Sequence, residues 1–256
     1  GGKQIITEVE LLKLHNPRNE QEFKAIVDEI TADGAQMVKE TRDAINVSKM
    51  QALTTGRVTF DNNNVKIDID FSEYIPEEHK IVLTGDNTWA NPEHDVIGDL
   101  IEWSNQYEDT NGKEADVILI SRKLQALLLK NTVIVNEVAG ANSGRGRVSV
   151  DELNTVLGGY GLPPVHIVTK TKANARPYGS SETKVIETYP ENRVIFASKG
   201  VGSFKMGPTV ENNHQPGIVL DAYDKSEPIQ SILRVVAAGF PVIENPSLLL
   251  YADVIE

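Results

Sequence analysis

Three side chains that could do chemistry together lie within six residues of one another: His94, Asp95 and Asp99. A histidine with two carboxylates can hold a divalent metal ion or move a proton to and from a substrate. Acidic residues at this spacing are also typical of a helix start, where they accept from free backbone N–H groups and face the positive end of the helix dipole. The sequence favours the helix start and leaves a small α+β metal-dependent hydrolase as an alternative function.

Motifs of several enzyme classes are absent from the sequence. It has no phosphate-binding Walker loop, no Gly-x-Gly-x-x-Gly after a strand, no His-Glu-x-x-His and no Gly-x-Ser-x-Gly. It has no cysteine, which excludes a thiol nucleophile, a thiolate metal site and a disulfide scaffold. His166 lies in an apolar stretch, so we expect a buried core histidine rather than a ligand. We therefore expect no catalytic, cofactor-binding or metal-ligating residues.

Four weaker patterns have structural explanations. Asp68 and Asp70 alternate with apolar residues in a strand, so both carboxylates point to one solvated face. Residues 61–64 resemble the start of a calcium loop but lack the glycine and the glutamate that complete one. Residues 144–147 hold two arginines without the pattern of a phosphate site, so we expect a flexible loop or a subunit contact with acidic neighbours. Residues 202–205 are expected to form a turn.

The first element that must position these residues is a long helix over residues 20–55. Asn19 and Glu22 form a capping pattern at its start, and Gly56 is a natural stop. Gly34 weakens its middle and is expected to kink or divide it. The helix would extend roughly 50 Å, which is too long to bury itself in a small compact core. It suggests a spine, a coiled coil or an element shared between neighbouring subunits.

The rest of the chain reads as mixed α/β and then β. We expect a hairpin over residues 57–71 and a second helix that starts at Asn91–Pro92, with Trp89 and Trp103 as core or interface anchors. Ser121 and Ser149 are expected to cap two further helices. Strands are expected over 117–120, 165–169, 194–197, 217–220, 229–238 and 248–254. This order suggests an α+β fold in which a middle domain is inserted between two parts of another.

The charge of the chain limits its partners. The 256 residues include 25 Lys and Arg against 37 Asp and Glu, for a net charge of −12. Such a surface repels nucleic acid and anionic membranes, so we expect no sequence-specific nucleic acid binding and no membrane association. No stretch approaches the length of an apolar membrane span. The start, Gly1-Gly2-Lys3-Gln4, is read as a trimmed end.

Several stretches, in order, resemble the tailed-phage major capsid proteins of the lambda E family. The helix end and strand Lys49–Phe60 resemble that family's Gln-Ala-Leu-x-x-Gly segment, and Thr88–Leu100 resembles its Trp-x-x-Pro-x-x-Asp-Pro-Ile-x-Asp-Leu entry into a middle domain, with Val96 in place of the frequent proline. Val117–Leu129 is similar to the strand and helix that follow there. Two late runs look like the family's C-terminal β return, Phe204–Thr209 and Gly239–Pro246.

This resemblance implies an α+β fold of the Hong Kong 97 capsid type, with a long spine helix and β-sheet peripheral domain and an inserted mixed α/β axial domain. Residues 19–90 and 224–256 would form the peripheral domain and residues 91–223 the axial domain. Residues 1–18 would be the remnant of an N-terminal arm and extended loop.

The resemblance also implies a function. The chain would be the major capsid protein of a tailed bacteriophage or prophage, a structural protein without catalysis or cofactor. It would self-assemble into hexamers and pentamers of an icosahedral shell that encloses the DNA genome. Scaffold, portal and decoration proteins would be its partners, with assembly in the host cytoplasm and a final place in the virion. An encapsulin-like shell protein is a further alternative with the same fold.

Overall fold

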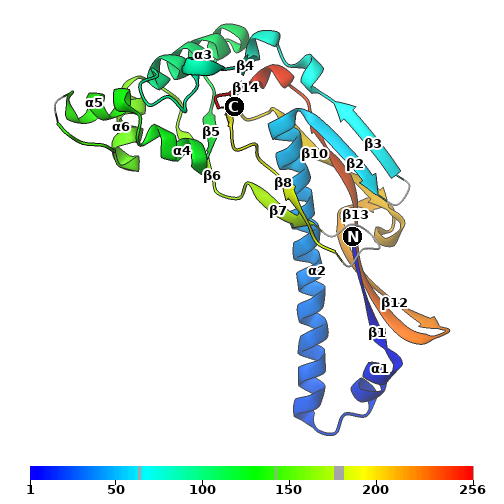
Figure 1. Ribbon diagram of the computed structural model, residues 1–256. Coiled ribbons are helices and arrows are strands. Elements are labelled where there is room, and N and C mark those ends of the chain that lie inside the picture. The colour runs from blue at the N-terminus through cyan, green and yellow to red at the C-terminus, as the bar shows by residue number, and fades with distance from the viewer. Residues whose placement is uncertain (63–64, 142, 176–181, 256) are drawn as a thin grey trace. The chain divides into compact units, whose positions relative to one another are not determined.

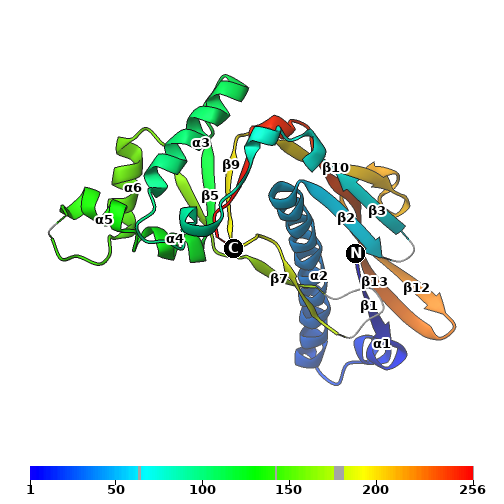
Figure 2. The ribbon, with the colours of Figure 1, turned by 45° about the horizontal axis from the view of Figure 1, so that its top comes forward.

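The structure is a computed structural model, and it describes residues 1–62, 65–141, 143–175 and 182–255. The chain divides into two compact units, each built from segments far apart in the sequence (Figures 1 and 2). Unit 1 comprises Gly1–Lys49 and Phe204–Pro241. Unit 2 comprises Met50–Ser203 and Val242–Glu256. The division falls inside one long helix and inside two late strands.

That helix is α2, and it runs without a break over the 36 residues Glu20–Thr55, which confirms the expected long helix. At its start, the Asn19 side chain accepts from the Glu22 N–H at 2.7 Å. The Glu22 carboxylate accepts from the Arg18 N–H at 2.7 Å, so the reciprocal half of the capping pattern lies one residue before the expected position. Gly56 ends the helix in the left-handed conformation, with φ of 68°.

Gly34 neither kinks nor divides α2, so that expectation was wrong. A methyl group at Gly34 would lie 3.3 Å from Leu233 Cδ2 and 3.4 Å from Leu220 Cδ2. The missing side chain therefore lets the helix approach the sheet of unit 1 closely. Packing explains this glycine, and the helix hydrogen bonds continue through it.

The sheet that lies mainly in unit 1 is built around one long strand, β13. β1 pairs antiparallel with β13 from Thr7↔Gln230 to Gly2↔Val235, and β12 pairs with the other side of the same segment. The strand order is β1-β13-β10-β11, with β12 also on β13. A short helix, α1, follows β1 (Figure 1). The bounds are β1 Gly2–Thr7, α1 Glu8–His15, β10 Gly202–Thr209, β11 Gln215–Pro216, β12 Ile218–Ser226 and β13 Ile229–Ile243.

The expected turn over residues 202–205 was wrong, because this segment begins the strand β10. Gly239 on β13 explains why a strand fits there. A methyl group at Gly239 would lie 2.6 Å from the Lys205 carbonyl oxygen, so a larger residue would keep the two backbones apart.

Unit 2 contains a second five-stranded sheet in the order β4-β14-β9-β5-β6. β14 is parallel to β4 and antiparallel to β9, and β5 is antiparallel to β9 and parallel to β6. Two separate two-stranded ribbons are β2–β3 and β7–β8. The strand bounds are β2 Arg57–Asn62, β3 Val65–Asp70, β4 Lys80–Val82, β5 Val117–Ser121, β6 Val165–Val168, β7 Lys172–Ala175, β8 Lys184–Glu187, β9 Arg193–Ala197 and β14 Leu249–Asp253.

The core of unit 2 forms where the helix α3 packs with this sheet. The apolar face of α3 is buried, with Leu100 and Tyr107 at most 1% exposed. Trp89 and Trp103 stack at 5.9 Å between ring centroids, which confirms them as core anchors. Ser121 and Ser149 cap their helices as expected. The helix bounds are α3 Val96–Asn111, α4 Arg122–Leu128, α5 Thr132–Ala139 and α6 Val150–Gly159.

Two local expectations in unit 2 were wrong. α3 begins at Val96 with Asp95 as its cap, rather than at Asn91–Pro92, because the Asn91 side chain accepts from the Glu93 N–H in a turn of its own. α5 was not foreseen, although Asn131 caps it by accepting from the Ile134 N–H at 3.1 Å. None of the helices in the described residues has the length and apolarity that a membrane crossing requires.

The close approach at Gly34 predicts the outcome of one substitution. Gly34→Leu places a side chain against Leu220 and Leu233, so we expect a net loss of about 1–2 kcal/mol after the helix propensity of leucine is counted. Amide hydrogen exchange of β12 and β13 measures the loss. Ala35→Leu, at the neighbouring exposed position, is the control and should leave the exchange unchanged. Equal exchange in both variants would contradict the packing role.

Candidate functional site

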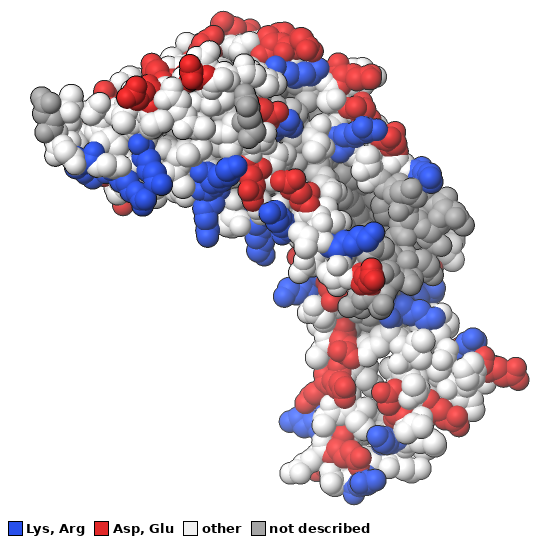
Figure 3. Space-filling view, in the orientation of Figure 1, with Lys and Arg blue, Asp and Glu red and all other residues white. Residues whose placement is uncertain are grey.

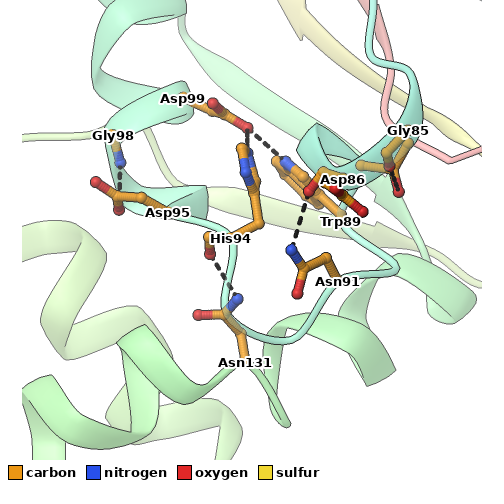
Figure 4. Close-up of polar contacts among 10 residues, drawn as sticks. Gly85, Asp86, Trp89, Asn91, His94, Asp95, Gly98, Asp99 and Asn131 are labelled. Atoms are coloured by element: carbon orange, nitrogen blue, oxygen red, sulfur yellow. Dashed lines mark hydrogen bonds and ion pairs between the residues drawn. The ribbon is translucent and has the colours of Figure 1, made fainter.

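His94 and Asp99 lie together, as the hydrolase alternative requires, but their contacts are those of a structural brace (Figure 4). The His94 Nε2 atom lies 2.7 Å from Asp99 Oδ2. The same carboxylate oxygen accepts from the indole N–H of the buried Trp89 at 2.8 Å. The two side chains are 16% and 17% exposed, so little of either faces solvent.

Asp95 does not join that pair. Its carboxylate accepts from the Gly98 N–H at 3.0 Å as the cap of α3, and Figure 4 shows it turned toward Gly98 and away from the His94 ring. The His94 carbonyl accepts from the Asn131 side chain at 2.9 Å, which ties this loop to the cap of α5. In the segments that the structure describes, no three His, Asp or Glu side chains are grouped to hold a metal ion.

Two further histidines, His166 and His79, lie in different surroundings. His166 is exposed on β6, which is an edge strand of the unit 2 sheet, so the expectation of a buried core histidine was wrong. His79 is the buried histidine: it stacks on Tyr107 at 5.7 Å, and its Nδ1 lies 2.9 Å from the Leu249 carbonyl oxygen. No periodic signal marks His79, because it lies in a short turn before β4.

Asp68 and Asp70 serve separate partners. Arg57 on the neighbouring strand donates two hydrogen bonds of 2.7 Å to Asp68, and these contacts hold the pKa of Asp68 below its usual range. Asp70 accepts from the Ser72 hydroxyl at 2.5 Å and from its N–H at 2.8 Å, which lowers the pKa of Asp70. The two carboxylates therefore do not share a proton. The calcium-like stretch 61–64 lies partly outside the described residues.

Arg145, in the arginine loop, finds its acidic partner within its own unit. Its guanidinium donates two hydrogen bonds of 2.9 Å to Glu152, on the exposed surface. Glu152 also accepts from the Ser149 N–H at 2.7 Å, which completes a capping box at the start of α6. The Arg145 contact, then the Ser149 contacts, lower the pKa of Glu152 to about 2.

Two surface hollows of about 500 Å³ each are of opposite character. The first, in unit 2, is acidic and polar. The second, in unit 1, is mainly apolar and lies between α1, the start of α2 and the start of β13. The first is lined by Glu78, Glu102, Asn105, Gln106, Asp109 and Thr110, and the second by Glu8, Leu11, Leu12, Leu14, His15, Phe23 and Ile229.

Large apolar side chains around the second hollow are exposed. Leu12 on α1 is 57% exposed, Phe23 on α2 is 43% exposed and Ile229 on β13 is 54% exposed. Val9 and Val27 are exposed nearby on the same two helices. A soluble monomer rarely leaves a continuous apolar patch uncovered, so this surface favours a contact with another protein.

Comparisons with known proteins point to one family. The family model described as phage major capsid protein E matches residues 2–247. A solved structure described as a prophage capsid protein of Escherichia coli CFT073 is 15% identical, with a TM-score of 0.68. The alignment covers 99% of this chain and 76% of the chain in that structure. A chain from the capsid of Myoviridae phage XM1 is 12% identical, with a TM-score of 0.50. The alignment covers 99% of this chain and 72% of the phage XM1 chain.

One curated relative is of another kind. A protein named transketolase from Dictyostelium discoideum is 25% identical over 245 residues, which is 90% of this chain. The chain spans only 34% of that relative's length, about one third. This match gives no support to catalysis in the chain.

The brace around Asp99 predicts a loss of stability when its carboxylate is removed. Asp99→Ala leaves the buried indole N–H of Trp89 without its acceptor, so the free energy of unfolding of unit 2 should fall by about 2–3 kcal/mol. Both tryptophans of the chain lie in unit 2, so their fluorescence during denaturant unfolding reports on it. Asp109→Ala, at an exposed position, is the control. An unchanged midpoint with loss of calorimetrically measured Mn²⁺ or Zn²⁺ binding would favour the hydrolase alternative.

The capping box at α6 predicts a pH dependence. The pKa of Glu152 is lowered to about 2, so its contacts persist through neutral and mildly acidic pH and are lost as the pH falls through about 2. Arg145→Ala should raise this pKa toward the usual range of a glutamate, as NMR titration of the side chain would record. Arg147→Ala is the matched control. A pKa that does not respond to Arg145→Ala would rule out the ion pair as its main cause.

Proposed function

Because the chain belongs to the phage major capsid protein E family, we propose that copies of it form the hexamers and pentamers of an icosahedral head that encloses a DNA genome. The protein is a bacteriophage head protein, and its family makes it a component of the virion. Its fold is the α+β capsid fold of the Hong Kong 97 type. The match over residues 2–247 is the observation that carries the proposal.

The exposed apolar surface of unit 1 supports self-assembly. Leu12, Phe23 and Ile229 surround a hollow that the described residues leave open. Covering apolar surface contributes about 25 cal/mol for each Å² removed from water, so a neighbouring copy gains stability by packing there. Closed symmetry repeats one such contact around the whole shell, and modest contacts are sufficient when they are repeated.

We keep the division into domains as part of this proposal. In this proposal residues 19–90 and 224–256 form the peripheral domain, with α2 as its spine, and residues 91–223 form the axial domain at the symmetry axes. The two compact units divide the chain elsewhere, because β4 and β14 share one sheet with β9, β5 and β6. Residues 1–18 precede the spine helix, and in unit 1 they include β1, which pairs with β13, and α1. The motifs that mark the family's middle domain, within Thr88–Leu100, support this assignment.

The remaining partners follow from the role of a shell. Scaffold, portal and decoration proteins bind the assembling or finished head, and assembly takes place in the host cytoplasm. The protein carries out no catalysis and has no sequence-specific affinity for nucleic acid. A net charge of −12 supports the latter, because an acidic subunit does not hold the packaged genome tightly.

Electron microscopy tests the proposal directly. The full-length protein, expressed together with its scaffold protein, should yield closed shells of uniform diameter, because the subunit contacts fix the curvature. Expression of the scaffold alone is the control and should yield none. A full-length protein that stays strictly monomeric under these conditions would overturn the proposal.

A further inference from the structure

Two corners of unit 2 carry opposite charge, and the placement of each follows from the sheet order. We propose that the acidic corner of one copy binds the basic corner of the next copy around the symmetry axis of a capsomer. This inference rests on the proposed capsid function and names one contact that would build its rings. The acidic corner is defined by Glu78, Glu102 and Asp109, and the basic corner by Arg122, Lys123, Lys170 and Lys172.

The acidic corner surrounds the hollow of about 500 Å³ beside α3. Glu102 and Asp109 are seven residues apart, so they share one exposed face of the helix. Glu78 joins them from the turn before β4, and the Gln106 side chain donates to the Glu78 carbonyl at 2.8 Å and fixes that turn to α3. No ion pair involves these three carboxylates among the described residues, although nearby Lys80 pairs with Glu77 at 3.0 Å.

The basic corner forms where two parallel strands end. β5 and β6 run parallel, with Ser121 opposite Val168. Parallel strands bring the residues after them to the same end of the sheet, so Arg122 and Lys123 lie on the side where Lys170 follows. α4 contacts β6, which keeps the first two near the third. Arg122, Lys123 and Lys170 are exposed, and in the described segments no carboxylate pairs with them.

Lys172 extends the basic corner, but two acidic residues lie next to this lysine. Its Nζ lies 3.6 Å from Glu191, and Glu187 is opposite it on β8. The corner therefore keeps the three unpaired cations Arg122, Lys123 and Lys170 as its net positive charge. On the face drawn in Figure 3, basic side chains gather along the lower edge of unit 2, with some acidic ones among them, and acidic side chains predominate along its upper edge.

The two corners are diagonally opposite. β4 and β6 are the two edge strands, and the pairings make β4, β14, β5 and β6 all point the same way, with β9 reversed. The acidic corner lies where β4 begins and the basic corner where β6 ends. Four strand spacings and one strand length place them about 25 Å apart. Opposite charges on opposite corners suit a head-to-tail contact, which closes into a ring.

The net charge of the protein also favours such a contact. Each copy carries a net charge of −12, so two copies repel one another at long range. A local pairing of three carboxylates with three cations offsets this repulsion and orients the approach. It also disfavours wrong pairings, since acid against acid or base against base is repulsive.

Charge reversal tests the contact on the full-length protein with its scaffold. The acidic-corner variant is Glu102→Lys with Asp109→Lys, and the basic-corner variant is Arg122→Glu with Lys123→Glu. Both variants should keep their helices, because lysine is a good helix former at exposed positions of α3 and glutamate suits the first turn of α4. Each variant should lower the yield of shells at least tenfold, with an unchanged unfolding midpoint. The fourfold variant reverses both sides of the contact and should restore the shells.

The control is Glu108→Lys with Glu114→Lys, which makes the same charge change on exposed residues of unit 2 outside the lining of the hollow. It should assemble like the unmodified protein. Shells at normal yield from either single-corner variant would overturn the inference, as would a folded fourfold variant that forms none. If the unmodified protein forms no shells, the proposed function fails, and this outcome is distinct from the failure of the contact.

Discussion

A helix of 36 residues extends about 54 Å, and the protein around α2 covers only part of its surface. In unit 1 its buried positions are Gly34, Met37 and Thr41, and in unit 2 they are Ala52 and Thr54. Among the described residues none buries the first turns in this way, and Phe23 and Val27 remain exposed there. Helices gain most of their stability in proteins from packing of an apolar face, so this end of α2 depends on a neighbour. The need for assembly follows from this constraint.

Unit 2 buries more of its apolar residues within its own core than unit 1 does. The central strands β9 and β14 are almost wholly buried, and the stacked tryptophans and the Asp99 brace close the core beside α3. The contact that we propose for unit 2 depends on charge. The two units would thus contribute differently to a shell: unit 1 through apolar area that lowers the free energy of association, and unit 2 through charges that select the orientation of the neighbour.

The sequence predicts α2 well because periodicity, capping and the stop at Gly56 all agree over a long segment. It cannot predict the role of Gly34, because the leucines that pack on it lie on strands almost 200 residues later. The same limit applies to His166, whose exposure depends on β6 being an edge strand. It applies also to the two charged corners, which follow from strand order. The start of α3 was misplaced for a local reason, because Asn91–Pro92 suits a turn as well as a helix.

Several motifs that follow one another along the chain as they do in a capsid family predicted the function, whereas the His94 cluster by itself suggested a hydrolase. Amide hydrogen exchange of residues 20–33 in free subunits and in assembled shells tests the central claim most directly. The account predicts at least tenfold slower exchange of this segment in shells, with the amides of β9 unchanged. Equal exchange of the segment in both states would show that no neighbour covers the start of α2, and would contradict the account.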